Sequence, residues 1–159
     1  MTEFAVERLY GRVVFREGAT EPYFVPSKRE IVLPAGVKID RTGLRHEMAH
    51  SIYHSLPEDD RKKLTEAFER EIGYADYMHI IRANGGRVGH PEEYYLKSDG
   101  QQNNDRIVNE WCATLAEHPE FYRNVFDFAP NFKHVFEEIG FNKPARTLRK
   151  LKKPQFGVK

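Results

Sequence analysis

The segment LRHEMAHSIYH, residues 44–54, has the hydrophobic period of an α-helix. Apolar residues recur every four positions and therefore share one helical face, while histidines recur with the same spacing on a roughly opposite face. The apolar set is Leu44, Met48 and Ile52, and the histidine set is His46, His50 and His54. Because the apolar face points into a core, this helix is expected to present its histidines side by side at a polar site.

Within this helix, His46-Glu47-Met48-Ala49-His50 has the pattern H-E-x-x-H. Two histidines four residues apart project from the same face, one turn apart, and can bind one zinc ion. Zinc lowers the pKa of a bound water toward 7, and Glu47 is close enough to accept a proton from that water as it attacks a carbonyl. We therefore predict zinc ligands at His46 and His50, and a general base at Glu47. The alternative is a solvated helix that carries histidines by chance, which the separate apolar stripe disfavours.

A catalytic zinc site needs a third protein ligand. A metzincin would have a histidine six residues after His50, but this chain has Leu56 there. His54 would lie about 12 Å along the helix axis from His46, too far to share the ion. The best candidate is Glu110, on the polar face of a second predicted helix. The alternative for Glu110 is an ordinary surface glutamate.

The chain before the histidine helix has the pattern of short strands. We predict strands at Arg12–Phe15, Tyr23–Val25 and Glu30–Leu33, the last two joined as an antiparallel hairpin through a turn at Pro26–Arg29. This forms a small N-terminal antiparallel β region.

The chain after the histidine helix is mostly helical by its periodicity. Ser55-Leu56-Pro57-Glu58 fits a capping box for a helix that ends near Gly73. Further helices are predicted around 107–116, after Pro119, and from Pro130 to Gly140, with loops at 84–90 and 98–105. The fold class is therefore α+β, with one domain over residues 1–159 and a basic tail at 141–159.

The two motifs together resemble those of the gluzincin metallopeptidases. His46-Glu47-x-x-His50 is followed by Asn109-Glu110-x-x-Ala113, with a spacing closer to the anthrax lethal-factor catalytic domain and the Mlc titration factor family than to thermolysin. The resemblance spans roughly residues 23–140. It implies a zincin-like fold, Zn²⁺ bound by His46, His50 and Glu110, and hydrolysis of peptide bonds.

Two positions differ from that family pattern. Lethal-factor-like members have an acidic residue one turn after the ligand glutamate, where this chain has Thr114. They also have an oxyanion-stabilising tyrosine about two turns before it, where this chain has Asn103. The resemblance therefore implies a donor from another segment, and we name Tyr95 first as a catalytic residue and Tyr94 second. The remaining candidate donors are Asn103, His79 and His90.

Two functions fit these residues. The first is a zinc-dependent peptidase, with an extended peptide or protein substrate paired to an edge strand near Glu30–Leu33. The second is a zinc-containing binding or regulatory module on a gluzincin scaffold, with little or no peptidase activity. The presence of Glu47 favours the peptidase, because a purely structural zinc site has no use for a general base.

Composition narrows the class of protein further. The chain has 159 residues, a net charge of +1 and a single cysteine, Cys112, which excludes an intrachain disulfide and a multi-cysteine metal site. The near-zero charge argues against nucleic-acid or membrane binding, although seven basic residues and no acid lie in 141–159. The first eight residues lack the pattern of a secretory signal, and no apolar run approaches a bilayer span. We expect a cytoplasmic protein.

Overall fold

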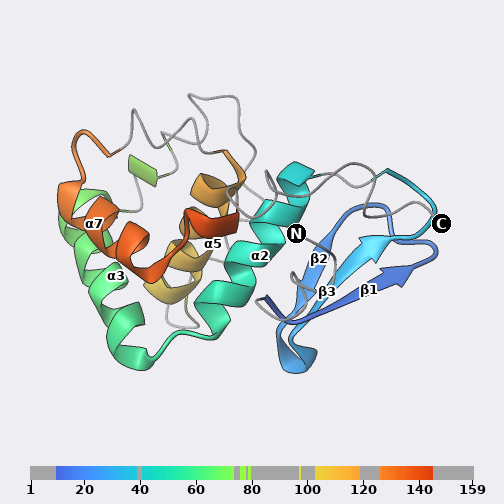
Figure 1. Cartoon of the computed structure of the whole chain (residues 1–159). Helices are drawn as coiled ribbons and strands as arrows, with labels where there is room; N and C mark the ends of the chain where they lie inside the picture. The colour runs from blue at the N-terminus through green and yellow to red at the C-terminus, as the bar shows by residue number, and fades with distance from the viewer. Residues whose placement is uncertain are drawn as a thin grey trace.

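The computed structural model describes residues 10–38, 41–73, 76–77, 79, 97, 103–118 and 126–144. In this part of the chain a small β-sheet lies on one side of helix α2, and the other helices lie on the opposite side (Figure 1). The elements in chain order are β1 (Arg12–Arg16), β2 (Tyr23–Val25), η1 (Pro26–Lys28), β3 (Glu30–Pro34), α2 (Arg41–His54), α3 (Glu58–Glu71), α5 (Asn104–Glu117) and α7 (Pro130–Ile139). The predicted α+β class is confirmed.

The three strands are in the order β1-β3-β2. The predicted hairpin is present, with β2 antiparallel to β3 and Phe24 opposite Ile31. The expectation of a wholly antiparallel region is wrong, because β1 pairs parallel to β3, with Val14 opposite Val32. The strand Glu30–Pro34 is therefore central rather than an edge, and the predicted substrate pairing near Glu30–Leu33 is wrong because both of its sides are already paired.

Helix α2 contributes to two hydrophobic clusters, one on each side of it. Leu44 and Met48 are fully buried against the sheet, as their spacing predicted. Ala49 and Tyr53 are buried in the larger cluster with the other helices, around Trp111. Burying a side chain as large as leucine or methionine contributes about 1.5–3 kcal/mol. Between these two packed sides, His46 and His50 lie toward α5.

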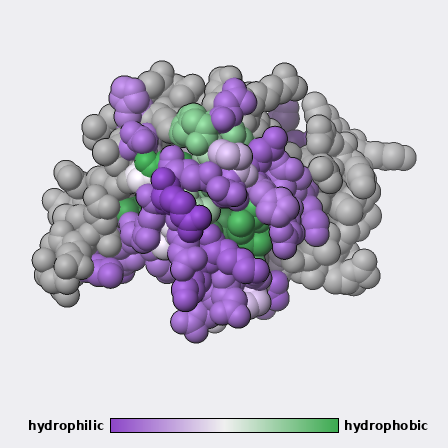
Figure 2. Space-filling view, turned by 90° about the vertical axis from the view of Figure 1, so that its left-hand side faces the viewer, coloured by the Kyte–Doolittle hydropathy of each residue, from purple (hydrophilic) through white to green (hydrophobic). Residues whose placement is uncertain are grey.

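The larger cluster is rich in aromatic rings contributed by α3, α5 and α7. The fully buried rings include Phe68, Trp111, Phe132 and Phe136. Viewed from the side of α3 and α7, the described surface is mostly hydrophilic, as expected when these rings point inward (Figure 2). Among the described residues, no helix combines the length and the apolar character needed to cross a bilayer.

The start of α3 differs from the predicted capping box. Ser55 directly follows the end of α2, and its hydroxyl donates to the carbonyl of Ser51 at 2.9 Å. Helix α3 begins at Glu58 after Pro57, with no side-chain cap. Its first turn holds three acidic residues, whose charge compensates the helix dipole in place of the cap.

The helix bearing Glu110 begins earlier than predicted. Asn103 is its N-cap and accepts a hydrogen bond from the Arg106 amide at 3.3 Å, so Asn104 and Asp105 are helical rather than part of a loop. Helix α7 begins at Pro130 and ends at Gly140, which has a φ of 105°, as predicted. The predicted loop at 84–90, most of the helix after Pro119 and the tail beyond residue 144 lie outside the described residues.

Candidate metal centre

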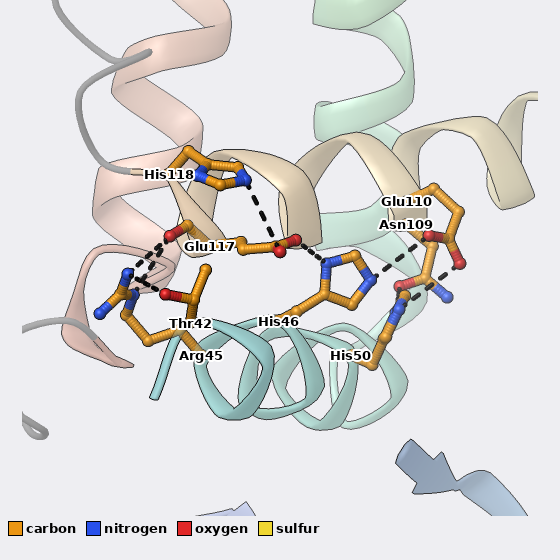
Figure 3. A network of polar contacts seen from close by, with 8 residues as sticks. All are labelled: Thr42, Arg45, His46, His50, Asn109, Glu110, Glu117 and His118. Carbon is orange, nitrogen blue, oxygen red and sulfur yellow. Dashed lines mark hydrogen bonds and ion pairs between the residues drawn. The ribbon is translucent and has the colours of Figure 1, made fainter. Parts of the chain in front are cut away.

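Helices α2 and α5 run antiparallel and face each other through their polar side chains (Figure 3). His50, late in α2, contacts Asn109 early in α5, and His46, one turn earlier in α2, contacts Glu117 at the end of α5. Ala49 of α2 and Ala113 of α5 are both buried in the same hydrophobic cluster. This alignment brings the H-E-x-x-H motif to the face of α5 that carries Glu110.

The two histidines converge on one carboxylate. Nε2 of His46 lies 3.5 Å from Oε2 of Glu110, and Nε2 of His50 lies 3.4 Å from its Oε1. Glu110 is buried, with 7% of its surface exposed. Two ligand atoms on a tetrahedral zinc, each about 2.1 Å from the metal, lie about 3.4 Å apart. Each observed separation is therefore close to that of two ligand atoms on one ion, and the two histidines face different oxygens of Glu110.

A second carboxylate, Glu47, lies close to the same histidines. One metal-binding atom from each of His46, Glu47 and His50 lies within 4.8 Å of the others, so these residues could hold a metal ion. Glu110 contacts Nε2 of both histidines, at 3.5 and 3.4 Å, and is therefore the predicted third ligand beside this group. The backbone amide of Phe24, on strand β2, donates to the Glu47 carboxylate. Glu47 is thus held on the sheet side of the centre, while Glu110 approaches from α5.

Each histidine has an oxygen partner on its other ring nitrogen. Nδ1 of His46 lies 2.8 Å from Oε2 of Glu117, and Nδ1 of His50 lies 2.8 Å from Oδ1 of Asn109. Because these oxygens can only accept, both Nδ1 atoms carry a proton, and both Nε2 atoms face Glu110. Such partners fix the orientation of metal-binding histidines and increase their basicity.

Neither partner was predicted from the sequence. The family resemblance has an acidic residue one turn after Glu110, at the position of Thr114, whereas the acidic partner in the structure is Glu117, seven residues after Glu110 and therefore on the same helical face two turns later. Asn109 immediately precedes Glu110. The signal for Glu117 was its helical spacing from Glu110, which indicates a shared face but not which histidine it meets.

Burial and the neighbouring polar groups shift the pKa values of the residues at the centre in different directions. Burial alone would lower the pKa of His46, but hydrogen bonds to Glu110 and Glu117 outweigh it and raise the value to about 10. Burial lowers the pKa of His50 to about 4 and raises that of Glu47 to about 7. Three carboxylates thus surround two imidazoles, and a cation at the centre would balance their charge.

The remaining predicted site residues lie elsewhere. Tyr95, Tyr94 and His90 fall outside the described residues, so their proposed role as oxyanion donor stays a prediction. His79 is exposed, and Asn103 uses its side-chain oxygen to cap α5. His54 is also exposed, as expected for a histidine too far along the helix to share the ion.

Comparison with known protein families, with curated proteins and with solved structures finds no match for this chain. The resemblance to gluzincins therefore rests on the residues of the candidate metal centre and on their geometry.

Proposed function

We propose that this chain is a zinc-dependent metallopeptidase of the gluzincin type. The observation that carries the proposal is the convergence of both Nε2 atoms on Glu110, at 3.5 and 3.4 Å. His46, His50 and Glu110 would hold the zinc, which leaves a fourth position open. Nitrogen and carboxylate ligands on a tetrahedral site suit zinc among the common metals.

The residues around the centre have separate roles in this proposal. Zinc, when bound, would supply a Lewis acid that lowers the pKa of water and polarises a carbonyl. Glu47, held by the Phe24 amide beside the histidines, would accept the proton of the attacking water and pass it to the leaving amine. Glu117 and Asn109 would keep the two imidazoles in the orientation and tautomer that the metal requires.

An extended substrate would pair with β2 rather than β3. β2 is an edge of the three-stranded sheet and the strand nearest α2 (Figure 1). Phe24, at its centre, already reaches Glu47 through its backbone amide. A peptide laid along this edge would bring its scissile bond close to the general base, while the Phe24 amide stays engaged with Glu47.

The test is hydrolysis of a mixed peptide library by the purified chain, with wild type compared to Glu47→Gln. Wild type should cleave peptides, lose activity with a chelator and regain it with zinc. Glu47→Gln should retain zinc and cleave about 10²–10⁴-fold more slowly, because the general base is lost while the ligands remain. A variant as active as wild type would remove Glu47 from the mechanism.

The alternative is a zinc-containing binding module without peptidase activity. It predicts one zinc per chain and no cleavage of any peptide in the same library. Zinc binding needs the partners of both Nδ1 atoms in either case, so these partners do not distinguish the two functions. Peptide cleavage by the zinc-loaded wild type distinguishes them.

A further inference from the structure

Arg45, the residue before His46, binds the end of the helix that carries Glu110. Its guanidinium donates to the backbone carbonyl of Glu117 from Nη2 at 2.8 Å and from Nε at 3.2 Å. Glu117 is the last residue of α5, where helix carbonyls have no partner within the helix. A cation at this position also complements the negative end of the helix dipole.

Glu117 is consequently held at both ends by consecutive residues of α2. Arg45 binds its backbone carbonyl, while His46 binds its carboxylate at 2.8 Å (Figure 3). α5 ends at Glu117, and the next residue, His118, is the C-cap, with its Nε2 3.6 Å from Oε1 of Glu117. Without Arg45, the last turn could fray and carry the Glu117 carboxylate away from His46.

We propose that Arg45 is a positioning residue of the metal centre that acts through Glu117. By fixing the last turn of α5 to α2, it sets the orientation of the carboxylate that holds the His46 ring. Arg45 touches neither the ligand atoms nor a substrate, so its effect is indirect. The inference rests on the zinc site of the proposed function but does not depend on peptide hydrolysis.

The experiment measures the zinc dissociation constant by chelator competition for Arg45→Met, Glu117→Ala and the double variant. Arg45→Met should weaken zinc binding about tenfold, and Glu117→Ala about 10- to 100-fold, the range found for partners of metal-binding histidines. Because Arg45 acts through Glu117, the double variant should bind zinc no more weakly than Glu117→Ala alone. Independent contributions would instead multiply.

Arg61→Met is the matched control. Arg61 donates from Nη2 to the carbonyl of His54, the last residue of α2, at 3.2 Å, so it also binds a helix end through its guanidinium. Its loss should lower stability in the same way yet leave the zinc dissociation constant within about twofold of wild type. If Arg45→Met does not fold, Arg45→Lys is used in its place. Lysine keeps the positive charge and can donate one hydrogen bond to the Glu117 carbonyl. Its zinc affinity should lie between those of wild type and Glu117→Ala.

Two results would overturn the inference. One is an Arg45 variant whose zinc affinity equals that of wild type while Glu117→Ala is impaired. The other is a double variant whose loss is the full product of the single losses. Both results differ from the one that would contradict the proposed function, namely that the zinc-loaded wild type cleaves no peptide.

Discussion

Nδ1 of His50 lies 2.8 Å from Oδ1 of Asn109, the residue directly before Glu110. Asn109 and Glu110 thus hold the two nitrogens of the same imidazole, one by the hydrogen bond and the other across the centre at 3.4 Å. Adjacent residues on α5 therefore control the tautomer, orientation and ligand geometry of His50. Asn109 and Glu110 together contact both ring nitrogens of His50, which Glu110 alone could not do.

Replacement of Asn109 should weaken metal binding without removing a ligand. We expect Asn109→Ala to bind zinc about 10- to 100-fold more weakly, because the His50 ring loses the acceptor that fixes its tautomer. Asn109→Asp, which keeps an acceptor oxygen, should bind within about tenfold of wild type. Chelator competition gives both values. Asn104→Ala is the control on the same helix, since the Asn104 side chain donates to the exposed carboxylate of Glu69 and its loss should leave zinc affinity unchanged. An equal loss there would indicate a general defect of α5.

The two carboxylates near the histidines should separate by metal content. Glu110→Gln should lose zinc affinity by more than about 100-fold, because a direct ligand loses its charge. Glu47→Gln, the same chemical change on the sheet side of the centre, should retain one zinc per chain. Elemental analysis of both variants after dialysis against a weak chelator measures this. Retention by Glu110→Gln together with loss by Glu47→Gln would reverse the two roles.

Local periodicity predicted the helices well because helix formation depends on residues three and four apart. The helix predicted to end near Gly73 is α3, and Gly140 marked the end of α7. The pairing of β1 could not be predicted in the same way. Its partner β3 is distant in sequence, and a short run such as Val13-Val14-Phe15 fits a parallel or an antiparallel neighbour equally well.

In the candidate site, too, contacts within one helix could be predicted from the sequence and contacts between helices could not. His46, Glu47 and His50 lie on one helical turn, so their spacing alone indicated a shared face. The roles of Glu117 and Arg45 depend on the antiparallel alignment of α2 and α5, which places residue 117 opposite residues 45 and 46. α2 packs in two hydrophobic clusters, whereas its sequence period indicated a single apolar face.

The oxyanion donor stays a prediction from the family resemblance. A hydrogen-bond donor to the developing oxyanion contributes about 3–4 kcal/mol, or about 10²–10³ in turnover. Tyr95→Phe should therefore reduce turnover by that factor and keep zinc content unchanged, with Tyr94→Phe as the second choice. Steady-state peptide cleavage by the two zinc-loaded variants measures it. Wild-type turnover in both would move the role to Asn103, His79 or His90.

Two glycines with left-handed backbones offer a matched test of the sheet. Gly11 has a φ of 105° and a methyl group there would lie 2.4 Å from the carbonyl oxygen of Arg29, whereas Gly18 has a φ of 83° with open space around it. The Arg29 carbonyl accepts from the Arg12 amide at the start of β1. Gly18→Ala should cost about 1 kcal/mol from the backbone alone, and Gly11→Ala about 1–3 kcal/mol more because the methyl displaces that carbonyl. Urea unfolding of the two variants measures the difference in their free energies of unfolding. Equal losses of unfolding free energy would mean that the contact between Gly11 and Arg29 does not constrain the pairing of β1 with β3.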